Sequence, residues 1–134
     1  MDGRAGGGIV GGSVKDILAE LAGELDGLLG LGVMDMDGVA IATYVPSGSI
    51  ISVELTAAQL AMVMRLSKST ADKLRLGELD ENLLTTSSRY ILTRPVGNHC
   101  YLAMVLSRDA ILGMVRLIAQ DYASRLYQAL PVAT

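Results

Sequence analysis

Two segments, one near each end of the chain, carry apolar residues at intervals of three and four, the spacing of one helix face. The first predicts a helix that Ser13 caps and that the glycines at positions 27, 30 and 32 end; its stripe is Val14, Ile17, Leu18, Leu21, Leu25 and Leu28. The last predicts a helix with a cap near Ser107 or Asp109 and a stop at Pro131; its stripe is Ile111, Val115, Ile118, Tyr122, Leu126 and Leu130. Both stripes indicate helices that pack one face on a core.

The middle of the chain predicts a longer helix with three different sides. Thr56 and Gln59 have the spacing of a capping box, and the helix is expected to run from there to about Leu74. The side expected to pack on a sheet holds Leu60, Val63, Met64, Ser67, Ala71 and Leu74. A second flank, about 100° away on the helical wheel, is either the margin of the core or a contact with another chain, and it holds Gln59, Met62, Leu66 and Lys73. The third side is interpreted as solvated and holds Arg65, Lys68 and Asp72.

Short runs rich in β-branched residues predict five strands. LGVMD and VAIATYV flank Asp37 and Gly38, a strong hairpin signal, and NLLTTS, RYILTRPV and HCYLAMVLS follow the polar break GELDE. Gly97 and Asn98 are expected to form a two-residue hairpin loop, and Pro95 to lie at a strand end or beside a bulge. The expected order is therefore helix, two strands, helix, three strands, helix.

No repeat or linker divides this order, so we expect one domain over residues 13–130, with a tail at 131–134. The glycine-dominated stretch before it, residues 1–12, is expected to be a flexible leader. This leader contains a literal G-x-G-x-x-G at 6–11, but only five residues precede the motif, too few for the strand that a dinucleotide site requires. We therefore expect no bound cofactor.

The stretch VMDMDGVAIAT contains D-x-D-G, the opening of many calcium-binding loops. A calcium loop of this kind needs an acidic ligand two positions before Asp35 and a glutamate six positions after Gly38, where the chain has Val33 and Tyr44. Asp35 and Asp37 are therefore interpreted as turn residues whose carboxylates bond nearby amides, and no metal site is expected.

Composition narrows the class of protein. Apolar residues make up 51% of the chain and charged residues 19%, which indicates a folded domain. A net charge of −3, no Trp, no Phe and only five Tyr exclude the positive groove and stacking platforms of nucleic-acid binding. Cys100 is the single cysteine, no basic segment precedes an apolar stretch at the N-terminus, and no window suits a membrane span. We expect a cytoplasmic protein without membrane insertion.

Catalytic chemistry finds little support in the sequence. His99 and Cys100 are adjacent on an expected strand, so they point to opposite faces and cannot act as a base and nucleophile pair. Carboxylates at Asp35, Asp37 and Glu54 lie beside turns, and no glycine cluster is followed by the Gly-Lys-Ser/Thr of a phosphate-binding loop. We expect no catalytic residues and no enzyme activity.

The joint order of elements and three stretches resembles the roadblock family, the dynein light-chain and bacterial gliding-motility regulator group related to longin domains. The stretches are VMDMDGVAIAT, LLTTSSRYILTRPVGNHCYLAMVLS and DAILGMVRLIA, and in the last of them Gly113 and Arg116 hold the characteristic places. The resemblance covers about Ser13 to Leu130 and implies an α+β fold. In that fold one helix covers one face of a five-stranded antiparallel sheet and two helices cover the other face.

The resemblance also implies a homodimer in which the third strands of two subunits pair at their edges and the middle helices pack together. The residues support this independently, because an unpaired strand edge invites pairing and NLLTTSS has neither Lys nor Pro to prevent it. A second apolar flank on the middle helix suits a contact between identical surfaces. The expected dimer interface is Gln59, Met62, Leu66, Lys73, Leu83, Leu84, Thr85 and Thr86.

Family members are platforms for small Ras-like GTPases, so the resemblance implies a regulator of nucleotide hydrolysis or exchange. The candidate GTPase contacts are Arg65, Lys68, Ser69 and Asp72. Two alternatives stay open: a structural, light-chain-like subunit without effect on nucleotide state, and a small-ligand sensor using the sheet face, which needs a pocket.

Overall fold

The chain folds into an antiparallel sheet sandwiched between helices, as the computed structural model describes it for residues 10–46 and 51–131. The expected leader residues 1–9, with most of the glycine motif, and the expected tail residues 132–134 lie outside the described residues. In chain order the described elements are α1 (Val10–Glu24), β1 (Leu28–Asp35), β2 (Ala40–Tyr44), α2 (Val53–Lys73), β3 (Asn82–Thr85), β4 (Arg89–Val96), β5 (Cys100–Ser107) and α3 (Leu112–Ala129).

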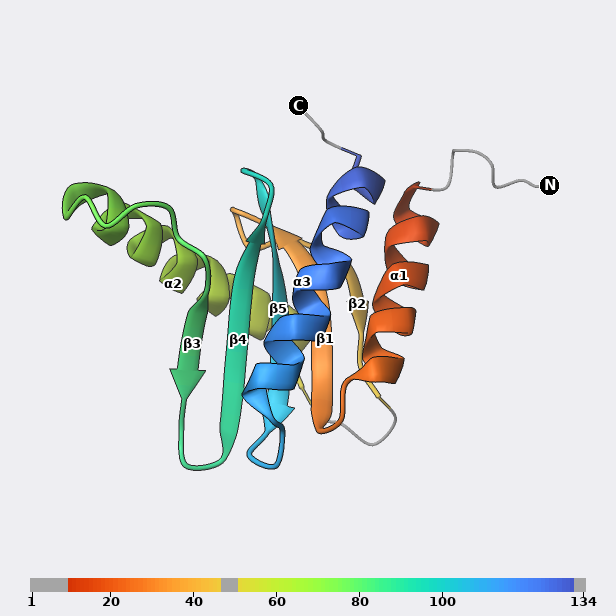
Figure 1. Ribbon diagram of the computed structural model, residues 1–134. Helices are drawn as coiled ribbons and strands as arrows, with labels where there is room; N and C mark the ends of the chain where they lie inside the picture. Colours follow the sequence, from red (N-terminus) through yellow and green to blue (C-terminus); the bar gives the residue numbers. More distant parts are fainter. Residues whose placement is uncertain (1–9, 47–50, 132–134) are drawn as a thin grey trace.

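The described strands form one five-stranded sheet in the order β2-β1-β5-β4-β3, and every neighbouring pair is antiparallel. Helices α1 and α3 lie side by side on one face of the sheet, and α2 covers the other (Figure 1). This confirms the expected fold class and element order. Strands β2 and β3 form the two margins, so each has one edge without a neighbour among the described strands.

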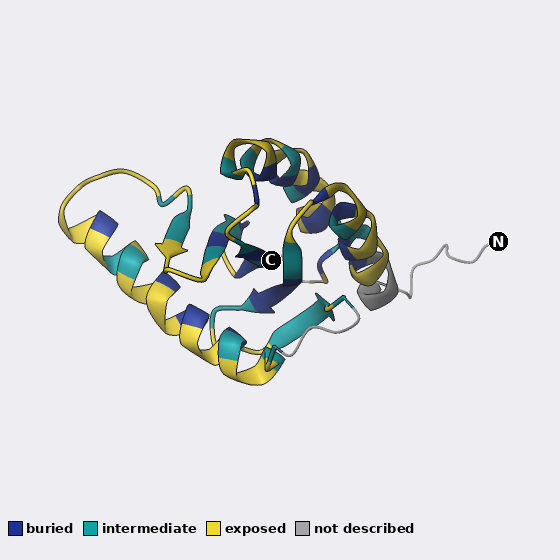
Figure 2. Cartoon of the chain, turned by 90° about the horizontal axis from the view of Figure 1, so that it is seen from below, coloured by how far each residue is buried: buried dark blue, intermediate teal, exposed yellow. Residues whose placement is uncertain are grey.

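The core has two parts because successive strand residues point to opposite faces of the sheet. On β5, Leu102 and Met104 are buried with α1 and α3, whereas Tyr101 and Ala103 are buried with α2. The α2 part is smaller, and α2 is buried only along the side turned to the sheet (Figure 2). Most of the surface of α2 is therefore available for contacts.

The helix starts differ from those expected. Helix α1 begins at Val10, three residues before Ser13, and it ends at Glu24, so Gly30 belongs to strand β1. Helix α2 begins one turn before the expected capping box, because Ser52 is its cap and its Oγ accepts a hydrogen bond from the Leu55 amide at 3.4 Å. Thr56 tolerates this interior position because its hydroxyl donates to the Ser52 carbonyl, 2.7 Å away.

Helix α3 also lacks the cap that the sequence suggested. Its first flanking residue is Ile111, which makes no side-chain cap bond, while Ser107 ends β5 and Asp109 lies in the turn between them. The carbonyl of Ile111 instead accepts from the amides of Met114 and Val115, at 3.0 and 3.1 Å. The backbone of the turn, rather than a polar side chain, sets the start of this helix.

The buried side of α2 is rotated from the one expected. Leu60, Met64 and Ala71 are buried as expected, but Val63 and Leu74 are 37% and 64% exposed. The buried stripe instead includes two alanines, Ala57 and Ala61, each almost completely buried. Small side chains let the helix approach the sheet closely, and a search for large apolar residues alone misses them.

The β4–β5 hairpin has a three-residue loop, so the expected two-residue loop is wrong. Val96 pairs with Cys100, which leaves Gly97, Asn98 and His99 as the loop. Gly97 has a φ of +71°, a conformation that favours glycine. Pro95 lies beyond the last β4 residue that pairs with β3, so its missing donor faces an open part of that edge.

Candidate functional site

Strand β3 presents its outer edge without a neighbour among the described strands. Its side chains alternate: Leu83 packs against the core shared with α1 and α3, whereas Leu84, opposite Ile91, lies on the α2 face and is 46% exposed. Thr85 and Thr86 are exposed. The edge is thus a short, uncharged strand with an apolar side chain beside the surface of α2.

The surface of α2 continues this apolar region. Met62 and Leu66 are 57% and 70% exposed, and Gln59 and Lys73 on the same flank are exposed as well. Asn82 Nδ2 donates to Ser67 Oγ at 2.7 Å, which fixes the start of β3 against α2. The residues expected at a dimer interface therefore occupy two adjacent elements.

Two exposed leucines at the end of this region were not predicted as contact residues. Leu74 and Leu76 follow α2 and are 64% and 69% exposed, with Arg75 between them at a positive φ of 55°. Two leucines in an otherwise polar segment were a usable signal, because large exposed apolar side chains in a cluster mark contact sites.

The candidate GTPase contacts lie on the margin of α2 away from β3. Arg65 is exposed, as expected of the solvated side, and its Nη1 also donates to the carbonyl of Met36 in the β1–β2 turn. Lys68 and Asp72 are exposed at the rim of a cavity, and Ser69 is half-buried. The four residues thus share one helix, and two of them share one hollow.

That cavity, of about 220 Å³, lies between α2, the β1–β2 turn, the segment before β3 and the β4–β5 hairpin. Its lining includes Tyr101, which is fully buried and whose hydroxyl has no hydrogen-bond partner within the described residues. Burial raises the pKa of Tyr101 to about 12. No pattern in the sequence indicated this cavity, since its walls come from segments far apart in the chain.

Two arginines hold the ends of β3 in place. Arg116 of α3 binds Glu81 in a two-pronged contact, with Nε 3.0 Å and Nη2 2.7 Å from Oε2, and this hydrogen bonding raises the pKa of Arg116. Arg108 Nη1 donates to the Thr86 carbonyl at 2.8 Å, and its guanidinium lies 4.6 Å from the centroid of the Tyr90 ring. Gly113, by contrast, faces open space.

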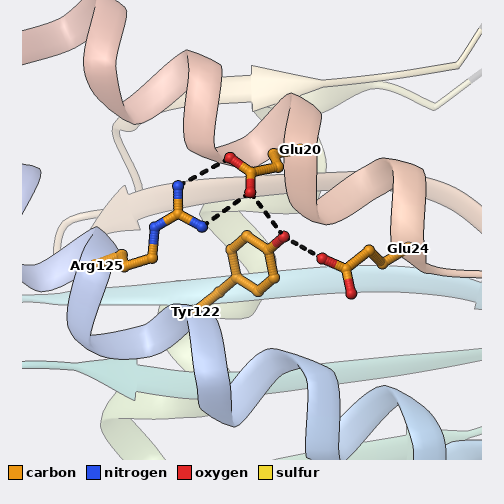
Figure 3. A network of polar contacts seen from close by, with 4 residues as sticks. All are labelled: Glu20, Glu24, Tyr122 and Arg125. Carbon is orange, nitrogen blue, oxygen red and sulfur yellow. Dashed lines mark hydrogen bonds and ion pairs between the residues drawn. The ribbon is translucent and has the colours of Figure 1, made fainter.

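A polar network on the other face of the sheet joins α1 to α3 (Figure 3). Arg125 Nη2 lies 2.8 Å from Glu20 Oε1, and the Tyr122 hydroxyl donates to Glu24 and, at 3.3 Å, to Glu20. The hydrogen bond to Glu24 is the main cause that raises the pKa of Tyr122 to about 12, and Arg125 lowers the pKa of Glu20. The network links α1 to α3 on the face of the sheet opposite α2, so it stabilises the packing of these two helices.

The residues considered for catalysis or metal binding lie in a turn, in a loop or in the core. Asp35 Oδ1 accepts from the amides of Asp37 and Val39, at 2.9 and 3.0 Å, and Gly38 has a φ of +87°, which confirms the turn interpretation. His99 is exposed in the hairpin loop, and Cys100 is buried, which raises the pKa of its thiol.

The described ranges, residues 10–46 and 51–131, offer neither a metal cluster nor a membrane span. They contain no group of three or more His, Cys, Asp or Glu side chains placed to hold a metal ion. They also contain no helix with the length and apolarity needed to cross a bilayer.

Comparison with known proteins gives a family and several structures of the same fold. Residues 14–106 match the family profile described as the Roadblock/LC7 domain. The gliding protein mglB from Thermus thermophilus superimposes with a TM-score of 0.82 at 18% identity, over 92% of both chains. A structure described as MglB with tetrameric arrangement superimposes with a TM-score of 0.83 at 19% identity, and the match covers 92% of this chain and 91% of that one. A Roadblock/LC7 domain from Streptomyces avermitilis superimposes with a TM-score of 0.79 at 13% identity, and the match covers 88% of this chain and 98% of that one. No curated protein sequence matches the chain.

Proposed function

We propose a function from one premise: the chain belongs to the Roadblock/LC7 domain family. On that premise it is a non-enzymatic, homodimeric platform in the cytoplasm that binds a small Ras-like GTPase and regulates its nucleotide state. The structures of similar fold include a gliding protein and an MglB in a tetrameric arrangement, and the second description supports a protein that associates with itself.

The observation that carries the dimer is the unguarded edge of β3 beside the apolar flank of α2. A free edge presents unpaired amides and carbonyls, and native proteins normally protect such an edge with charges, proline or a bulge. Here Leu84 is half-exposed at the edge, and Met62 and Leu66 are exposed on the adjacent helix. A second copy, related by a twofold axis, would pair its own β3 with this edge and cover both flanks.

The GTPase contact is assigned to the margin of α2 that holds Arg65, Lys68, Ser69 and Asp72. Arg65 is anchored to the β1–β2 turn through the Met36 carbonyl, which keeps its guanidinium close to the protein surface. A guanidinium held at the surface in this way can position a partner's loops, whereas it is poorly placed to insert into the partner's active site. A platform can change hydrolysis or exchange in this way, by stabilising one arrangement of the partner's switch segments.

The direct test is a binding measurement with a small Ras-like GTPase, loaded with GDP or with a GTP analogue. Regulation predicts different affinities for the two forms, because a ligand shifts a two-state partner only through differential affinity. Lys68→Glu should weaken binding about tenfold, a change of about 1.4 kcal/mol, while Lys15→Glu on α1 serves as the matched control because it is exposed on the opposite face. Equal binding of both nucleotide forms would favour the scaffold alternative instead.

A further inference from the structure

The cavity beside α2 is a built feature of the fold, because four separate segments form its walls. Helix α2 contributes one wall, the β1–β2 turn and the segment before β3 contribute two more, and the β4–β5 hairpin closes the far side. Its volume of about 220 Å³ is somewhat below the 300–1,000 Å³ typical of pockets for drug-sized ligands. It therefore suits a molecule with a single ring or a short aliphatic chain.

Three flexible or apolar side chains line the cavity. Met36 and Met64 face it from the β1–β2 turn and from α2, and Leu79 faces it from the segment before β3. Methionine side chains are flexible and polarisable, so they adjust to ligands of irregular shape. These side chains favour the apolar body of a ligand.

The rim carries an excess of negative charge. Lys68 and Asp72 are one helical turn apart on α2, so their charges largely offset each other. Glu78, in the segment before β3, also lines the cavity, and within the described parts of the chain neither Asp72 nor Glu78 makes a side-chain hydrogen bond or an ion pair. One carboxylate thus remains uncompensated at the mouth of an apolar hollow.

The cavity wall also contains an unsatisfied polar atom. Tyr101 is fully buried, and its hydroxyl has no hydrogen-bond partner in the described residues. Buried hydroxyls normally have a partner, so each exception calls for a physical reason. Because Tyr101 lines the cavity, a hydrogen-bonding ligand bound there would supply that partner.

We propose that this cavity binds a small organic amine in its protonated form, with the apolar body against Met36, Met64 and Leu79 and the ammonium group paired with Glu78. The site is separate from the proposed dimer surface, and it shares Lys68 and Asp72 with the proposed GTPase contact. A bound amine would therefore compete with, or reshape, the surface offered to a GTPase. This is the pocket that a ligand-sensing role requires.

The test uses the full-length protein alone, so its outcome does not depend on any GTPase. Three matched probes, 2-phenylethylamine, 2-phenylethanol and 3-phenylpropanoate, are titrated into the isotopically labelled chain at pH 7 and followed by backbone amide shifts in NMR. The amine should shift amides around the cavity, near Leu79, Asn98 and Tyr101, and should bind at least tenfold more tightly than the alcohol or the carboxylate.

Two variants identify the pairing group. Glu78→Gln should weaken amine binding about tenfold, and Glu78→Lys should reverse the preference so that 3-phenylpropanoate binds more tightly than the amine. Asp121→Asn, an exposed carboxylate on α3, is the matched control and should leave binding unchanged. Equal binding of all three probes, no cavity shifts at millimolar amine, or an unchanged affinity in Glu78→Gln would each overturn the proposal.

Discussion

The backbone conformation of Gly97 allows the β4–β5 hairpin to close. Its φ is +71°, and a Cβ at this position would lie 2.5 Å from Cε1 of Tyr127. The exposed Tyr127 ring can move aside, but the backbone conformation remains unfavourable for any residue with a side chain. Gly97→Ala should therefore lower the free energy of unfolding by about 1 kcal/mol or more.

Gly113 provides the matched control for this change. It lies in the first turn of α3, and a Cβ there would meet nothing within 4 Å. Gly113→Ala should leave the stability unchanged or raise it by up to about 0.5 kcal/mol, since alanine favours helix. Urea denaturation of both variants measures the difference. A Gly97→Ala protein as stable as the parent would show that the loop does not require glycine.

Single residues were predictable from the sequence where local chemistry alone decides their place. Asp35 and Gly38 form the turn that an Asp-Gly pair indicates, with bonds from the Asp35 carboxylate to nearby amides. The cap of α2 was not predictable in this way, because Ser52 and Thr56 both precede apolar residues and both are good caps. The structure assigns the cap to Ser52, which adds a full turn to the helix.

At the scale of elements, the pairing of α1 with α3 should depend on pH through Glu20. The hydrogen bonds from Arg125 lower the pKa of Glu20 below its ordinary value of 4.5. A carboxyl group with a lowered pKa stabilises the fold above its unfolded-state pKa, and this contribution is lost as the pH falls through the lower, folded-state value. The network of Figure 3 should thus stabilise the helix pair at neutral pH and weaken below about pH 4.5.

Thermal unfolding of Glu20→Gln at pH 7 and at pH 3 measures this contribution. The variant should melt at a lower temperature than the parent protein at pH 7, and the difference between the two melting temperatures should be smaller at pH 3. Arg125→Ala removes the same ion pair, so adding Glu20→Gln to it should cause little further loss at pH 7. A melting difference that is the same at both pH values would show that the carboxylate charge is not responsible.

Element types were predictable because the chain changes its apolar period from about 3.6 to 2 at each junction. Element faces were harder. The buried stripe of α2 uses Ala57 and Ala61, whereas Val63 and Leu74 are exposed. Small residues carry almost no signal in a pattern based on hydrophobic size, yet they decide how closely a helix lies on a sheet.

At the scale of the whole molecule, the order of elements and the resemblance together predicted the sheet and the faces that the helices cover. The cavity was not predictable, because Met36, Leu79 and Tyr101 meet only once three connections have folded. The free edge of β3 was predictable only in part. Its sequence lacks a guarding charge or proline, and the structure places that stretch at the margin of the sheet.

The central claim is that two copies of this chain associate through β3 and the adjacent flank of α2. Leu84→Lys places a charge at the edge, while Leu117→Lys places the same charge at an exposed leucine, 59% accessible, on α3. Sedimentation equilibrium at micromolar concentration should give twice the mass of one chain for the parent protein and for Leu117→Lys, and the mass of one chain for Leu84→Lys. A parent protein that sediments as a single chain would contradict the account.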